Sequence, residues 1–129
     1  MHNRKYAIEW IDFARRNLDT AKLLFQENHY TDIIAIEIHQ TIEKSFKAVL
    51  AYNGIKLPRT HNLTELYKYC GEYFDFTDLD IDDLIEINDY YEDERYPGPK
   101  YSMPTKEEIS KNLEIAEYMV KSVSNYIKQ

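Results

Sequence analysis

The stretch "TKEEISKNLEIAEYMVKSVSNYI", residues 105–127, decides the fold class of this chain. Its apolar side chains recur every three or four residues, which is the spacing of one face of an α-helix. Thr105 is followed three residues later by Glu108, as in a capping box, where the two side chains bond backbone groups of the first turn. We therefore predict a long amphipathic helix that buries the stripe Ile109, Leu113, Ala116, Val120, Val123 and Ile127.

The same helical spacing continues through most of the remaining chain. Gly54 suits the left-handed cap that ends many helices, because glycine has no Cβ to clash there. Asn62 is a candidate N-cap, and Glu65 three residues later suggests a second capping box. The pattern predicts four more helices, over about residues 6–27, 31–53, 62–71 and 80–92.

The predicted helices are joined by short connections, and no segment has the alternation of a strand. Short connections between long helices favour antiparallel neighbours. We therefore predict an all-α protein, an antiparallel up-and-down bundle of four long helices plus one short helix. With 129 residues the chain has the size of one domain, so residues 1–129 should form a single domain. In the fourth helix we expect inward-facing Ile81, Leu84, Ile85 and Tyr91.

The net charge of −7 comes from one segment. Residues 75–94 hold ten acidic and no basic side chains, whereas the flanking parts of the chain are close to neutral. Long nucleic acid, double-stranded DNA included, should not bind broadly to such a surface, but a local basic site is compatible with it. Because the chain has one cysteine, no signal peptide and no apolar run of membrane length, we expect a cytoplasmic protein without membrane contact.

Metal and nucleophile motifs are weak in this sequence. The segment "DLDIDD", residues 78–83, resembles the start of a calcium loop, but Asp83 stands where that loop needs glycine for its sharp turn. Acids at a helix start are a sufficient explanation, because they favour the helix dipole. The four histidines lack zinc-like spacing, and Cys70 has the setting of a small buried hydrophobe. We expect no metal and no other cofactor.

The second predicted helix places Gln40, Glu43 and Lys47 on one face. Glu43 and Lys47 are four residues apart and can form an ion pair one turn along the helix. An ordinary exposed face with a weak pair is the interpretation that spacing alone favours, and a binding face is the alternative.

A longer stretch, "AIEIHQTIEKSFKAVLAYNGIKLPRTHNLTEL", residues 35–66, carries a specific resemblance. A glutamine, a glutamate–lysine pair, a second lysine, a glycine and a "PRTH" loop follow one another in it, and "RYP", residues 95–97, precedes the last helix. Together these pieces strongly resemble the HEPN domain family, over about residues 10–126. The matching positions are Gln40, Glu43, Lys44, Lys47, Gly54, Pro58, Arg59, Thr60, His61 and Arg95.

The resemblance implies a helical bundle that commonly dimerises. Many HEPN domains resemble metal-independent ribonucleases in which an arginine is followed, after four to six residues, by a histidine. Such a histidine would move protons while the arginine holds phosphate. Here Arg95 is present, but no histidine follows it, and Tyr101 stands in the histidine's place. The candidate catalytic residues are Arg95, Tyr101 and His61, although we favour His61 as an anchor of its own loop through a ring-to-backbone hydrogen bond.

By the same resemblance, the protein is expected to be a binding partner of a minimal nucleotidyltransferase in a toxin–antitoxin-like pair. Its ligand would be a nucleotide or short RNA, with Arg95 as the central phosphate contact. Pairing of Arg95 with acids of the fourth helix, such as Asp89 or Glu92, is the structural alternative. An active metal-independent endoribonuclease that uses Tyr101 or His61 is the functional alternative. The expected phosphate site comprises Arg95, Lys47, Lys44, Gln40, Glu43 and Tyr96.

We also predict a homodimer. Aromatic residues are enriched in interface cores, and two-fold dimers are the commonest assembly. The turn between the last two helices is rich in tyrosine, which gives a candidate interface formed by Tyr90, Tyr91, Tyr96 and Tyr101.

Overall fold

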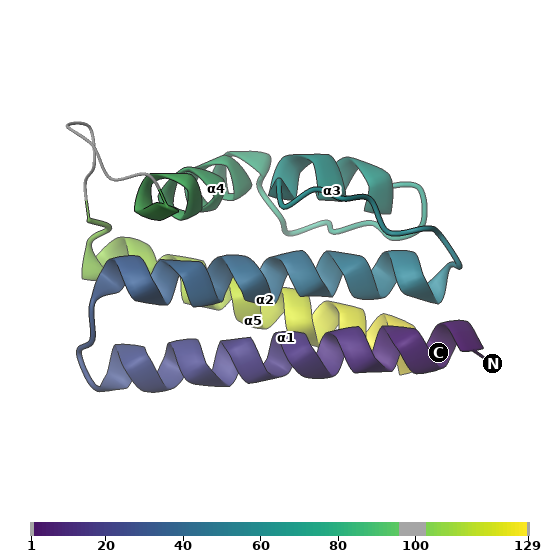
Figure 1. Ribbon diagram of the computed structural model, residues 1–129, viewed down its shortest axis with the longest axis horizontal. Coiled ribbons are helices and arrows are strands. Elements are labelled where there is room, and N and C mark those ends of the chain that lie inside the picture. Colours follow the sequence, from purple (N-terminus) through teal and green to yellow (C-terminus); the bar gives the residue numbers. More distant parts are fainter. Residues whose placement is uncertain (1, 96–102, 129) are drawn as a thin grey trace.

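The computed structural model describes residues 2–95 and 103–128, and within them the side chains of residues 3–91 and 103–128. This part of the chain forms helices and no strand, so the all-α prediction is confirmed (Figure 1). Three long helices, the 15-residue α4 and the short α3 match the predicted set. The helices are α1 (His2–Gln26), α2 (Thr31–Tyr52), α3 (Leu63–Cys70), α4 (Ile81–Arg95) and α5 (Lys106–Lys128).

Helix α2 is the centre of the bundle and contacts each of the other helices (Figure 1). The helices α1 and α4 run in the direction opposite to α2 and α5, which is the predicted up-and-down arrangement. Helix α4 and the short helix α3 lie on the side of α2 that faces away from α1. The connection after α2 doubles back along α2 before α3 begins, and this path brings residues near 61 over the middle of α2.

The hydrophobic core lies around α2 and α5. All six residues of the predicted α5 stripe are buried, as are Ile34, Ile38 and Ile42 of α2. Phe46 of α2 is fully buried and packs edge-on against Phe76, with ring centroids 5.4 Å apart. Burying a side chain of this size contributes roughly 1.5–3 kcal/mol, so the central position of α2 gives the bundle much of its stability.

Helix α4 faces the core differently from the prediction. Leu84 is buried as expected, but Ile81 and Ile85 are 39% and 45% exposed, so the expectation for these two residues is wrong. The buried positions after Leu84 are Ile87 and Asn88, three and four residues on. Helix α4 packs mainly against α2 and α3, which cover one narrow face of it, so Ile81 and Ile85 remain exposed to solvent.

Three of the predicted helix ends are formed by the expected residues. Gly54 has φ +70° after α2, and the Asn62 side chain accepts hydrogen bonds from the backbone N–H groups of Thr64 and Glu65. At α5 the capping box is complete, since Thr105 N donates to Glu108 and Glu108 N donates to Thr105 Oγ1, each at 3.1 Å. The second capping box is not formed, because the Asn62 N–H donates to Thr60 Oγ1 instead of Glu65.

A helix that crosses a bilayer needs about 20 predominantly apolar residues. None of the helices within residues 2–95 and 103–128 is long and apolar enough to cross a membrane.

Candidate functional site

A buried carboxylate, Glu43, lies at the middle of α2 where the doubled-back connection crosses it. Its side chain is only 3% exposed, so the expectation of an ordinary exposed face is wrong at this position. The predicted pair with Lys47 is formed, with Nζ 2.7 Å from Oε2. The Nδ1 atom of His61 lies 3.0 Å from the same oxygen. One buried carboxylate therefore holds a lysine from its own helix and a histidine from the next connection.

The charge of Glu43 is set by these neighbours. Burial by itself would raise the pKa of Glu43, but hydrogen bonds from Lys47 and His61, together with the charge of Lys47, lower this pKa below its ordinary value. Glu43 is therefore ionised at neutral pH. A buried carboxylate is costly unless its oxygens are paired and hydrogen-bonded, and Lys47 and His61 meet that requirement.

The His61 ring is held at Nδ1, and among the described residues nothing bonds its other nitrogen. Its side chain is 59% exposed, and Nδ1 contacts the Glu43 carboxylate rather than a backbone carbonyl, so the expected ring-to-backbone anchor is replaced. Because a carboxylate oxygen only accepts, this contact places the proton on Nδ1. In the described part of the chain Nε2 has no hydrogen-bond partner. This arrangement fixes the tautomer and leaves Nε2 available to accept a proton.

A second histidine, His39, lies behind Glu43 inside the bundle. Its Nε2 is 3.2 Å from Asn88 Oδ1, and that oxygen also accepts from Leu63 N at 3.1 Å. The His39 Nδ1 atom is 3.6 Å from Glu43 Oε1, which is too long for a hydrogen bond. Burial lowers the pKa of His39 to about 4, against the opposing charge of Glu43, so this ring is neutral at pH 7. We call Glu43, Lys47, His61, His39 and Asn88 the Glu43 cluster.

Tyr91 connects the Glu43 cluster to the end of α4. Its ring stacks on His39 with centroids 4.0 Å apart and lies 6.5 Å from the His61 ring. The backbone of α4 continues for one turn beyond Tyr91 and ends at Arg95. The side chain of Arg95, and Tyr96 and Tyr101 entirely, lie outside the described residues.

The remaining predicted site residues divide between two faces of α2. Gln40 is half-buried one turn before the Glu43–Lys47 pair. Lys44 turns toward α1, where its Nζ donates to Asn17 Oδ1 at 2.8 Å, and Asn17 in turn donates to Glu37. The structure thus brings Glu43, Lys47 and His61 into direct contact and places Lys44 beside them along α1.

Four residues at this site are absent from the predicted site: His39, Asn88, Tyr91 as a stacking partner, and Trp10, whose ring centroid lies 5.4 Å from Lys47 Nζ. One local signal was available, since His39 and Glu43 are four residues apart on a helix. The others carry no local signal, because Trp10, Asn88 and Tyr91 reach α2 from other helices.

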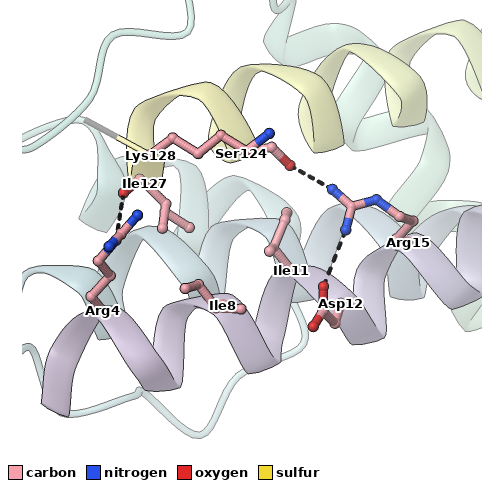
Figure 2. Close-up of a pocket in the computed structure, with 8 residues that line it drawn as sticks. All are labelled: Arg4, Ile8, Ile11, Asp12, Arg15, Ser124, Ile127 and Lys128. Atoms are coloured by element: carbon pink, nitrogen blue, oxygen red, sulfur yellow. Dashed lines mark hydrogen bonds and ion pairs between the residues drawn. The ribbon is translucent and has the colours of Figure 1, made fainter.

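A hollow of about 200 Å³ lies elsewhere, between α1 and α5 (Figure 2). Ile8 and Ile11 line it, and its arginines are engaged by the chain itself. Arg15 donates to Asp12 at 3.1 Å and to Ser124 at 2.9 Å, and Arg4 Nε donates to the Ile127 carbonyl at 3.4 Å. None of the predicted site residues whose side chains the structure describes lines this hollow.

Cys70 is fully buried, its thiol donates to the Phe46 carbonyl, and burial raises its pKa to about 12. The thiolate is therefore not formed at neutral pH, as the interpretation of Cys70 as a small hydrophobe requires. No group of three or more His, Cys, Asp or Glu side chains within the described residues could hold a metal ion.

Comparison with solved structures finds the same fold. The chain superposes on TT1696 from Thermus thermophilus with a TM-score of 0.74 and 20% identity, over 97% of this chain and 98% of the other. It superposes on ST0689, described as an archaeal HEPN homologue, with a TM-score of 0.66 and 22% identity, over 94% and 97% of the two chains.

Sequence comparison extends this likeness. A protein of Methanocaldococcus jannaschii named "Putative toxin MJ1304" is 28% identical, over 98% of this chain and 91% of the relative. The model of the HEPN domain matches residues 7–126, which is nearly the whole length. On this match, together with the helical bundle and the "PRTH" loop at Glu43, the chain belongs to the HEPN domain family.

Proposed function

We propose that this HEPN protein is the binding component of a toxin–antitoxin-like pair, that it associates with a minimal nucleotidyltransferase, and that it binds nucleotide or short RNA through phosphate. The ligand would lie at the carboxyl end of α4, with Arg95 as its main phosphate contact and Lys47 and His61 beside it. The likeness to a protein named as a toxin supports the toxin–antitoxin setting.

One observation carries the phosphate site. Lys47 and His61 come from different segments, yet both contact Glu43, and the His61 ring lies 6.5 Å from that of Tyr91, one helical turn before the end of α4. A helical turn advances about 5.4 Å, so the backbone of Arg95 follows Tyr91 by about that length, on the His39 side of the Glu43 cluster. Arginine is suited to this role because its planar donors bind two phosphate oxygens at once.

Calorimetry with ATP and with a short oligoribonucleotide tests the binding proposal. We expect binding that weakens as salt rises and is lost in Arg95→Ala. Arg4→Ala is the matched control, because Arg4 lies at the α1–α5 hollow on another part of the surface. Unchanged affinity in Arg95→Ala would remove Arg95 from the site. Co-purification with a nucleotidyltransferase encoded next to this gene tests the partner, and separate elution of the two proteins would contradict it.

A second candidate function, metal-independent RNA cleavage, is favoured by the Glu43–His61 pair. A carboxylate that orients a histidine and leaves the other ring nitrogen free is the arrangement used for proton transfer in hydrolases. His61 Nε2 would take the proton of a ribose 2′-hydroxyl while the 2′-oxygen bonds to phosphorus. The bond from phosphorus to the 5′-oxygen would break, and water would supply the proton of the new 5′-hydroxyl.

This candidate is tested with single-stranded RNA in EDTA. Products that end in a 2′,3′-cyclic phosphate, together with a loss of at least about tenfold in rate in His61→Asn and in Glu43→Gln, are expected if it holds. His29→Asn is the control, because His29 is exposed in the connection between α1 and α2. Intact RNA with wild-type protein would reject cleavage and leave the binding function in place.

A further inference from the structure

Three cations converge on two aromatic rings of α1. Lys47 Nζ lies 5.4 Å from the Trp10 ring centroid, and Arg16 Cζ and Lys44 Nζ lie 5.3 Å and 5.8 Å from that of Phe13. The two rings contact each other edge-on, with centroids 6.4 Å apart. We call Trp10 and Phe13 the aromatic ledge. Phe13 is 48% exposed and Trp10 is half-buried, so the ledge remains open to a ligand.

The aromatic ledge adjoins the Glu43 cluster. Lys47 belongs to both, because its Nζ contacts the Glu43 carboxylate and lies over Trp10. Arg16 and Lys44 form no ion pair with a carboxylate in the described part of the chain, since Lys44 donates to the neutral amide of Asn17. Their positive charge is therefore available beside the rings. Aromatic faces next to unpaired cations are the composition of sites that stack bases and hold the phosphate backbone of single strands.

Acidic side chains give the site a direction. A hollow of about 250 Å³ beside Phe13 is lined by Glu9, Asp12 and Arg16. Carboxylates repel phosphate but accept hydrogen bonds from the amino groups of bases. A base would therefore lie against Phe13 toward Glu9 and Asp12, and its phosphate would lie toward Lys44 and Lys47. The ligand is also restricted to one or a few nucleotides, because further phosphates of a long polyanion would be repelled by Glu9 and Asp12.

We infer that the aromatic ledge is a base-stacking subsite that directs a nucleotide, or one end of a single-stranded RNA, toward the Glu43 cluster. This inference rests on the proposed binding of nucleotide or RNA and adds the base as a recognised group. A base bound at Phe13 would place the following phosphate beside Lys44, and Lys47, which lies over the neighbouring Trp10, joins the ledge to Glu43 and His61.

Trp10 is the only tryptophan of the chain, so its fluorescence reports on the ledge alone. Wild-type protein would be titrated with AMP, with a hexameric oligoadenylate and with ribose 5-phosphate, which lacks a base. We expect AMP and the oligonucleotide to quench the emission and ribose 5-phosphate to leave it unchanged. Tighter binding of the oligonucleotide than of AMP would identify RNA as the preferred source of the base, and equal affinity would identify a mononucleotide.

Variants separate stacking from charge. Phe13→Leu should weaken binding of the base-containing probes about tenfold, the effect expected for loss of one stacked base. Lys44→Gln should weaken binding and reduce its salt dependence by about one ion. Tyr69→Leu and Lys121→Gln are the controls, because Tyr69 is an exposed aromatic residue of α3 and Lys121 an exposed cation of α5. Both controls should bind like wild type.

The outcomes distinguish this inference from the proposed function. Oligonucleotide binding that is lost in Arg95→Ala, with unchanged Trp10 fluorescence and full affinity in Phe13→Leu, would overturn the ledge and keep the proposed function. Equal quenching in wild type and Arg95→Ala would support the ledge and remove Arg95 from the site. An absence of binding would overturn both. A change of mass in Phe13→Leu by light scattering, at unchanged nucleotide affinity, would show that the ledge is a protein contact and overturn it.

Discussion

At the scale of single residues, Glu43 shows how one buried charge organises its surroundings. Its side chain is 3% exposed, and a carboxylate in that position is stable only when its oxygens are paired. Lys47 bonds it from one turn along α2, and His61 bonds it from the connection that crosses α2. The orientation of the exposed His61 ring is thus set by its bond to the buried Glu43 carboxylate.

The Glu43–Lys47 pair should contribute far more to stability than an exposed pair. Lys47→Met leaves the buried carboxylate with His61 as its remaining strong donor, and it should lower the free energy of unfolding by about 3 kcal/mol. Lys22→Met is the matched control, because the pair of Lys22 with Glu117 is 43% and 50% exposed and should contribute less than about 1 kcal/mol. Urea denaturation followed by circular dichroism measures both. Equal decreases in the free energy of unfolding of the two variants would show that the buried Glu43–Lys47 pair stabilises the protein no more than an exposed pair.

His39 should make the folded state sensitive to acid. Its pKa is about 4 in the folded protein against 6.5 for an unperturbed histidine, so between these values the unfolded chain binds a proton that the folded chain does not. The free energy of unfolding therefore loses nothing to His39 above about pH 6.5, and it decreases as the pH drops below that value. The expected loss from this residue is about 2 kcal/mol between about pH 7 and about pH 5.

His39→Gln removes the titrating group and should flatten the pH dependence of the free energy of unfolding over this interval. His29→Gln, which changes an exposed histidine, should retain the wild-type slope. Denaturation curves at the two pH values provide the comparison. The assignment to His39 fails if His39→Gln loses as much stability on acidification as wild type. Glu43 also destabilises the folded state on acidification, but only at lower pH. Its pKa is lowered in the folded state, and the stability that its charged form contributes is lost as the pH falls through that pKa.

At the scale of elements, the helix ends are set by local chemistry, whereas the buried face of each helix depends on its neighbours. Thr105 and Glu108 cap the N-terminus of α5 with reciprocal hydrogen bonds that involve only four consecutive residues. In α4, by contrast, Ile81 and Ile85 are exposed although they have the same spacing as core residues. The difference arises because α2 and α3 cover one narrow face of α4.

Two glycines that follow helices should respond oppositely to the same substitution. Gly54→Ala should lower stability by about 1–2 kcal/mol, because φ is +70° and the added Cβ would lie 3.0 Å from Asn3 Nδ2. Gly71 has φ −60° and ψ −20°, and its added Cβ would meet nothing nearer than 3.5 Å. Gly71→Ala should therefore be neutral or stabilising by up to about 1 kcal/mol. Thermal unfolding of both variants tests this, and a destabilised Gly71→Ala would contradict it.

At the scale of the whole molecule, the position of α2 assembles the site. Because α2 contacts every other helix, α1 brings Trp10 to Lys47, α4 brings Asn88 and Tyr91 to His39, and the connection to α3 brings His61 to Glu43. The backbone of α4 continues for one turn beyond Tyr91 and ends at Arg95. Tyrosines of this region form the predicted dimer interface. Tyr90 and Tyr91 of that interface are described, and both are half-buried.

The homodimer remains a prediction about this end of the bundle. Light scattering coupled to size exclusion should give about twice the chain mass of 15.5 kDa. An aromatic interface should be insensitive to moderate salt, since it depends mainly on apolar burial rather than on surface charge. A monomer mass across a wide concentration range would contradict the dimer.

The sequence by itself determined those features that depend on residues within about one helical turn. These are the helices, the α5 stripe, the caps at Gly54, Asn62 and Thr105, and the Glu43–Lys47 pair. Helical periodicity contains this information because side chains three and four apart share a face whatever the rest of the chain does. The "PRTH" loop identified His61 as a candidate site residue, but it did not predict the contact of His61 with Glu43.

Only the tertiary structure decided how buried these residues are and which of them meet. His61 bonds a residue 18 positions away, and His39 bonds Asn88 49 positions away. No local pattern specifies such distances, because they follow from the path of the connection and from which helices pack together. The same packing buries Glu43, which by spacing alone belongs to an exposed face, and leaves Ile81 and Ile85 in solvent, since burial depends on the neighbouring helix rather than on the residue itself.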